Sequence, residues 1–181
     1  YQPHQHITRH AVKGKDSFMA QLKILTEKDP ALRKKSRPVT EISPRIQTLL
    51  DDMLETMRRA DGCGLAAPQV GVLRRIVVIE VTPGEVLELI NPEIIAQSGE
   101  MTGPEGCLSV PGKQGIVKRP SYVRVSALDR NGVMQTYEGT ELLARCFCHE
   151  IDHLDGILYT DKAEKILYPD EDGDYDEDEE A

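Results

Sequence analysis

The sequence predicts an α+β protein with mainly antiparallel sheets, packed around a helix in the C-terminal half that carries a metal-binding motif. Three observations support this class. An amphipathic helical pattern opens the chain's core region, β-rich segments follow it in succession, and a second helical pattern comes after them. The strands do not alternate with helices, so a parallel βαβ arrangement is not expected. A length of 181 residues is enough for one domain with a single core.

The first helix is expected to begin near Ser43, which can serve as N-cap, with Pro44 in the first turn. It should end at Gly62. Before it, residues 22–38 mix apolar and charged residues with two prolines, which predicts extended or irregular structure. The apolar residues that recur at helical spacing are Ile46, Leu49, Leu50, Met53, Leu54 and Met57.

Strands are expected over residues 75–81, 86–97, 122–128 and 133–137, which are β-branched, apolar or alternating. The last two should form a hairpin that turns at Asn131-Gly132, because this dipeptide favours a tight two-residue turn.

The second helix should begin near Thr140, a residue that can cap it, and run to about Asp155. Gly156 is placed to end it. Its apolar positions are Leu142, Leu143, Cys146, Phe147, Ile151 and Leu154.

This second helix carries His149 and His153, whose i,i+4 spacing puts two imidazoles on one face, within reach of one ion. Glu150 lies beside them and is free to move protons to and from an activated water molecule. A hydrolytic ion usually has three protein ligands and an open position, so a third ligand is needed. Tyr159 stands where the longer protease signature has its third histidine.

Cys107 is the strongest candidate for the third ligand, because residues 105–112 contain glycines and a proline that predict a turn rather than a continuing strand. Cys63, Cys146 and Cys148 are alternatives, which we interpret mostly as small buried hydrophobic residues. Cys148 points about 100° away from its neighbour His149 on the helix, which makes it a poor ligand for the same ion.

The net charge of −9 is concentrated at the C-terminus, where residues 170–180 contain nine carboxylates and no base. We expect residues 169–181 to be a disordered acidic tail that repels nucleic acid, and residues 19–168 to be the catalytic domain. Residues 1–18 are expected to be an added leader. Their histidines are discounted as ligands: His4, His6 and His10. No apolar run approaches the roughly 18 residues of a membrane span, and the four cysteines suggest a reducing compartment.

Three segments taken together resemble the peptide deformylase family, and they occur in the family's order. The resemblance covers roughly residues 20 to 165, and the short spacing between the first two segments is similar to the bacterial type 1 form. The segments are Gly62-Cys63-Gly64-Leu65-Ala66-Ala67-Pro68-Gln69, Glu105-Gly106-Cys107-Leu108-Ser109 and His149-Glu150-Ile151-Asp152-His153-Leu154-Asp155-Gly156.

The resemblance implies removal of the formyl group from the N-terminal formyl-methionine of nascent proteins, with release of formate. It implies one divalent ion, Fe²⁺ in cells and Zn²⁺, Ni²⁺ or Co²⁺ in preparations, held by Cys107, His149 and His153. It assigns general acid-base catalysis to Glu150, and stabilisation of the oxyanion to Gln69 and the backbone N–H of Leu108. The residues expected to contact the substrate are Gly62, Gly64, Gly106, Leu142 and Cys146.

The expected partners are N-formylmethionyl nascent peptides, with transient proximity to the ribosome and no nucleic-acid surface or membrane. The expected location is the bacterial cytoplasm; an organelle is an alternative for which the sequence shows no transit peptide. Two features depart from the family. Cys148 replaces the usual glutamine, and residues 162–167 are short where some members continue as a long basic helix that contacts the ribosome.

Two other functions compete with this interpretation. A zinc endopeptidase built on the same helical motif would cleave unformylated peptides and use a third ligand other than Cys107. A metal-binding module without catalysis would leave Glu150 as an ordinary surface carboxylate.

Overall fold

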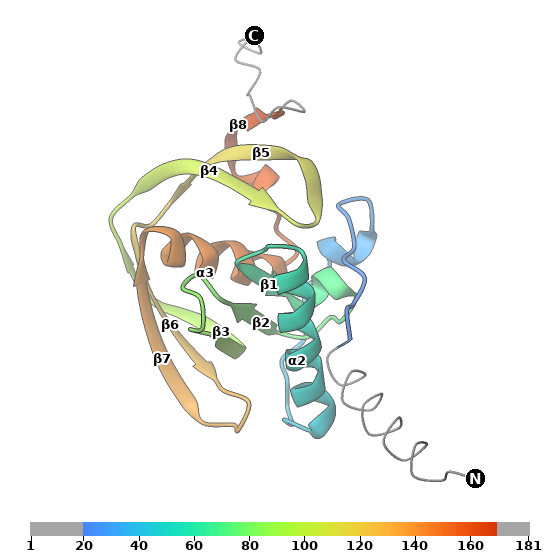
Figure 1. Ribbon diagram of the computed structural model, residues 1–181. Coiled ribbons are helices and arrows are strands. Elements are labelled where there is room, and N and C mark those ends of the chain that lie inside the picture. The colour runs from blue at the N-terminus through green and yellow to red at the C-terminus, as the bar shows by residue number, and fades with distance from the viewer. Residues whose placement is uncertain (1–19, 170–181) are drawn as a thin grey trace, which may run out of the picture.

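The structure is a computed structural model that describes residues 20–169; the expected leader and the acidic stretch from residue 170 onward lie outside the described residues. Figure 1 shows a central helix, α3, enclosed by curved antiparallel strands, with α2 to one side. In chain order the elements are η1 (Pro30–Arg33), α2 (Pro44–Arg59), β1 (Gly64–Ala66), η2 (Ala67–Val70), β2 (Ile76–Ile79), β3 (Leu87–Ser98), β4 (Met101–Cys107), β5 (Val110–Arg119), β6 (Tyr122–Leu128), β7 (Met134–Thr140), α3 (Glu141–Leu154), η3 (Tyr159–Asp161) and β8 (Ala163–Leu167).

The strands form two sheets, and the pairs within each sheet are antiparallel. One sheet has the order β1-β2-β3-β6-β7, and the other has the order β4-β5-β8. The five-stranded sheet therefore leaves β1 at an edge. In Figure 1, β4 and β5 arch over α3 on the side away from β2 and β3. The predicted α+β class with antiparallel sheets around this helix is confirmed.

Strand β2 is buried on both faces, which explains its uninterrupted apolar sequence. Alternate side chains of a strand point to opposite faces of the sheet. Val77 and Ile79 pack in the cluster that contains α3 residues. Ile76 and Val78 pack in the cluster that contains Met53 of α2. The five-stranded sheet thus lies between the two helices, and burying apolar surface on both sides holds α3 in place.

Both predicted helices and the predicted hairpin are present. Helix α2 starts at Pro44 and α3 ends at Leu154, followed by Gly156 with φ of +74°. Strands β6 and β7 pair from Tyr122↔Thr140 to Leu128↔Met134, across the turn at Asn131-Gly132. Thr140 precedes α3 as expected, but its side chain makes no capping hydrogen bond.

The three-stranded sheet was not predicted. Residues 105–112 were expected to form a turn, but the turn is confined to Leu108 and Ser109, with Cys107 paired to Val110 across it. The glycines and proline on either side belong to β4 and β5. The segment before α2 contains the short helix η1 and is otherwise irregular, which agrees with the predicted extended or irregular structure. No helix within residues 20–169 is long and apolar enough to cross a bilayer.

Candidate metal centre

Helix α3 directs His149 and His153 toward β4, where they meet Glu105 and Cys107, and directs Glu150 toward Gly64 of β1. His153 and Glu150 are buried, with 1% and 3% of their surface exposed. The two imidazole rings meet edge to face, with centroids 5.0 Å apart. One turn of helix separates them, so the backbone of α3 by itself sets their relative position.

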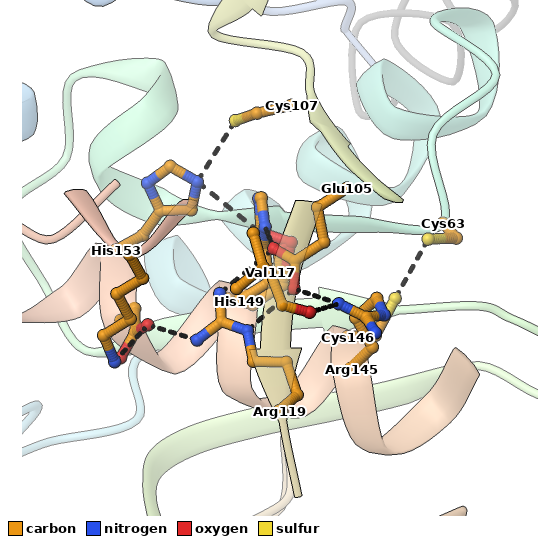
Figure 2. A network of polar contacts seen from close by, with 12 residues as sticks. Cys63, Glu105, Cys107, Val117, Arg119, Arg145, Cys146, His149 and His153 are labelled. Carbon is orange, nitrogen blue, oxygen red and sulfur yellow. Dashed lines mark hydrogen bonds and ion pairs between the residues drawn. The ribbon is translucent and has the colours of Figure 1, made fainter. Parts of the chain in front are cut away.

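The last residue of β4 supplies a thiol to the same point. Cys107 Sγ lies 3.3 Å from His153 Nε2. One potential ligand atom from each of Cys107, His149 and His153 lies within 4.8 Å of the other two. Figure 2 shows the thiol directed at the imidazole of His153. A sulfur and two ring nitrogens are the donor set of a hydrolytic metal site with an open position, so these residues fit a divalent ion.

The surroundings of the imidazoles support this fit. His149 Nδ1 lies 2.8 Å from Glu105 Oε2, which holds the ring so that Nε2 is free to bind an ion. His153 Nδ1 and Glu150 Oε1 are buried with no hydrogen-bond partner among the described residues. Burial, followed by the neighbouring His149, lowers the pKa of His153, so that this ring is neutral and able to bind a metal.

Glu105 is the buried anion that orients His149. Arg119 donates to both of its oxygens, at 2.7 and 3.0 Å, and Arg145 donates to Oε1 at 2.9 Å (Figure 2). Arg119 also reaches Asp152 on α3 at 2.7 Å. Burial opposes ionisation of Glu105, but the hydrogen bonds from His149 and Arg119 outweigh it and lower its pKa to about 2. A fully ionised carboxylate therefore holds the imidazole of His149 in place.

The surroundings of Glu150, unlike those of Glu105, favour its protonated form. Burial raises its pKa to about 7, within the range in which a carboxyl group can both accept and return a proton. A Cβ atom placed on Gly64 would lie 2.6 Å from Glu150 Oε2, so β1 runs directly past this carboxyl group. The non-catalytic alternative requires Glu150 to be a solvated surface carboxylate. Its burial contradicts that alternative.

Gln69 lies beside Cys107 and Ser109. Its Oε1 accepts a hydrogen bond from the backbone N–H of Ala66 at 2.9 Å, and its Nε2 lies 3.1 Å from Ser109 Oγ and 3.6 Å from Cys107 Sγ. The side chain is buried, with 1% exposed. These contacts hold an amide donor next to the thiol of Cys107.

A cleft of about 460 Å³ is lined by Gln69, Cys107, His149 and Glu150. Every substrate-contacting residue proposed from the sequence lines it. Leu142 is about half exposed and Cys146 is buried. The proposed substrate and oxyanion residues along this cleft are Gly62, Gly64, Gln69, Gly106, Leu108, Leu142 and Cys146.

Three features of the site escaped the sequence analysis. Glu105 lies in one of the three segments that resemble the family, and a carboxylate two residues before a proposed ligand is a signal that could have identified it. Arg119 had no local signal. Cys63 and Cys146 were interpreted separately, but their sulfur atoms lie 2.9 Å apart. Tyr159 does not join the ligands and instead stacks on His149, with ring centroids 6.0 Å apart.

The fold and the cluster of a thiol and two imidazoles are those of a metallohydrolase, with Cys107, His149 and His153 as its candidate ligands. The family model for polypeptide deformylase matches residues 21–167. A peptide deformylase of Alkaliphilus metalliredigens is 62% identical over 139 residues, which cover 77% of this chain and 94% of that protein. One from Lachnoclostridium phytofermentans is 56% identical over 164 residues, covering 90% and 99%.

Solved structures of peptide deformylases are also similar to this chain. A peptide deformylase from Legionella pneumophila matches with a TM-score of 0.77 and 46% identity, covering 79% of this chain and 86% of that one. One from Synechococcus elongatus in complex with actinonin matches with a TM-score of 0.77 and 41% identity, covering 80% and 79%. The chain belongs to the peptide deformylase family. It is a metalloenzyme that removes the formyl group from the N-terminus of nascent peptides.

Proposed function

We propose that Cys107, His149 and His153 hold one divalent ion and that Glu150 is the acid-base group for hydrolysis of N-formylmethionyl peptides. The observation that carries this proposal is the convergence of the three potential ligand atoms within 4.8 Å, beside a buried carboxyl group. An ion in this position would act as a Lewis acid towards water and the formyl carbonyl. Fe²⁺ is our proposal for the ion in cells; Zn²⁺, Ni²⁺ or Co²⁺ suit the same donors in preparations.

Glu150 would accept a proton from the attacking water at a carboxylate oxygen and then pass it to the departing amine. Its raised pKa favours this double role, because a group that titrates near neutrality transfers a proton efficiently in both directions. Gln69 Nε2 and the backbone N–H of Leu108 would donate to the oxygen that becomes negative as the formyl carbon turns tetrahedral. Both residues line the cleft.

The peptide would lie along β1. This strand pairs with β2 on one side only and borders the cleft, so its other edge can pair with a substrate backbone. Backbone pairing tolerates any sequence after the methionine. Leu142 and Cys146 would contact the methionine side chain. A formyl carbon carries only hydrogen, so a tight site around the ion would admit it and exclude the bulkier carbonyls of ordinary peptides.

Bacterial relatives and a nascent substrate support the cytoplasm as the working location, with transient proximity to the ribosome. The four free cysteines suit a reducing compartment.

Formate release from a formyl-Met peptide tests the assignment of Glu150. The enzyme is loaded with iron under anaerobic conditions, and wild type is compared with Glu150→Gln. We expect kcat to fall by roughly 10²- to 10⁴-fold, since the variant keeps the size of the side chain but cannot accept the proton. Glu164→Gln, the same change at an exposed position of β8, should keep wild-type activity. Metal content is measured in all three proteins.

Equal rates in wild type and Glu150→Gln would contradict the acid-base role. Absence of formate in every sample with full metal content would contradict the proposed substrate. An unformylated peptide is assayed in parallel, because its cleavage would favour the endopeptidase alternative.

A further inference from the structure

Two thiols that belong to neither the ligands nor the acid-base group meet in the wall of the cleft. Cys63, just before β1, and Cys146, on α3, have sulfur atoms 2.9 Å apart (Figure 2). Both residues line the cleft, Cys63 half-buried and Cys146 5% exposed. The pair therefore joins the start of the edge strand to the metal-binding helix, at a surface that small solutes can reach.

The other two cysteines have different surroundings. Cys107 Sγ is directed at His153 and Gln69. Cys148 is buried, and burial raises the pKa of its thiol. Among the described residues, only Cys63 and Cys146 have their sulfur atoms in contact with each other. Of the four free thiols, Cys63 and Cys146 are therefore the pair placed to form a disulfide with each other.

Closing this pair into a disulfide requires little movement. A disulfide bond is about 2.0 Å long, so the sulfur atoms must approach by about 0.9 Å. Cys63 stands between Gly62 and Gly64, and glycine leaves the backbone free to adjust. The hydrogen bond with Cys146 also lowers the pKa of Cys63, to about 7, which makes part of this thiol a reactive thiolate at neutral pH.

We propose that Cys63 and Cys146 are an oxidisable dithiol, which a hydroperoxide converts into a disulfide that links the start of β1 to α3. The Cys63 thiolate attacks an oxygen of hydrogen peroxide, the O–O bond breaks, and Cys63 becomes a sulfenic acid; the departing hydroxide takes up the proton that Cys63 lost on ionisation and leaves as water. The Cys146 sulfur then attacks the Cys63 sulfur and expels a second water. Two thiols lose two electrons, and hydrogen peroxide is reduced to two waters.

The consequence for catalysis rests on the proposed function, in which Cys146 contacts the methionine side chain. A disulfide would change the shape of that wall and hold the segment before β1 against α3. It leaves the three ligands and Glu150 chemically intact. We therefore expect oxidation to raise KM for a formyl-Met peptide several-fold more than it lowers kcat.

Peptide mapping of the full-length holoenzyme tests the covalent step independently of activity. The zinc-loaded protein is used, because zinc does not react with peroxide, and it is treated with hydrogen peroxide and digested with trypsin without reductant. Cys63 lies in peptide 60–74, Cys146 in peptide 146–162 and Cys107 in peptide 76–113. We expect peptides 60–74 and 146–162 to appear linked, two hydrogen atoms lighter than their sum, and to separate with a thiol reductant.

Cys148 shares peptide 146–162, so Cys148→Ser is the matched control and should keep the link. Cys63→Ser and Cys146→Ser should each abolish it. Absence of the link with zinc retained, or a link to Cys107 or Cys148 instead, would overturn the proposal. A complete link that leaves KM unchanged would overturn the effect on substrate binding, whereas an inactive reduced enzyme that still forms the link would count against the proposed function alone.

Discussion

Gly156 packs so closely against the backbone of Arg33 that a side chain at this position would not fit. Its φ is +74°, and a Cβ atom there would lie 2.5 Å from the carbonyl oxygen of Arg33. Gly156→Ala therefore combines an unfavourable backbone conformation with a backbone clash. We expect the free energy of unfolding to fall by more than about 2 kcal/mol, measured by urea denaturation.

Gly84→Ala is the matched control. Gly84 has a similar φ of +85°, but a Cβ atom there would meet nothing within 4 Å. This variant should lose only the conformational part, about 1 kcal/mol. Equal losses in the two variants would show that the contact between Gly156 and Arg33 does not constrain the protein.

Arg119 ties three elements together. From the end of β5 it donates to Glu105 on β4 and to Asp152 on α3, and its side chain is only 3% exposed. Arg119→Met would leave a buried carboxylate without its main partner. We expect unfolding free energy to fall by about 3–5 kcal/mol in urea denaturation, because an uncompensated buried charge is costly.

Arg124→Met provides the comparison. Arg124 lies on β6 and pairs with Glu138 at 3.6 Å, with side chains 47% and 62% exposed. Exposed pairs of this kind contribute at most about 1 kcal/mol. A loss at Arg119 no larger than that at Arg124 would contradict the view that the buried ion pairs hold the hairpin to the helix.

The proposed ion would join the two sheets of the molecule, because Cys107 comes from the three-stranded sheet and both histidines from the helix packed on the five-stranded one. Chelation should therefore destabilise the whole protein. With free Zn²⁺ at 100 times its dissociation constant, linkage predicts a gain of about 2.7 kcal/mol over the metal-free protein. Calorimetry should show a lower Tm after chelation.

Hydrogen exchange should locate this effect in residues 101–119, which form the β4–β5 hairpin. Re-addition of Zn²⁺ or Ni²⁺ should restore the Tm, whereas Mg²⁺ should not, because it prefers oxygen ligands. The same Tm with and without chelator would argue against an ion that links the three-stranded sheet to α3.

Local patterns were enough to predict α2, α3, β2 and the β6–β7 hairpin, since helical periodicity, β-branched runs and Asn131-Gly132 act over a few residues. The three-stranded sheet was missed because β4 and β5 contain glycines and prolines that also suit turns, and because β8 is short. Its strands are held by long-range pairing, which no local pattern records. The burial of Arg119 depends on that pairing in the same way.

The residue types of the proposed centre can be read from the sequence alone: two histidines one helical turn apart, a glutamate between them and a cysteine elsewhere. Three contacts become visible only in the folded chain: Cys107 reaches His153 across 46 residues, Glu105 orients His149, and Cys63 meets Cys146. Helical spacing is a property of the local backbone. The other distances depend on how β4, β5 and the segment before β1 pack against α3. This packing depends on long-range contacts throughout the core, which no short stretch of sequence records.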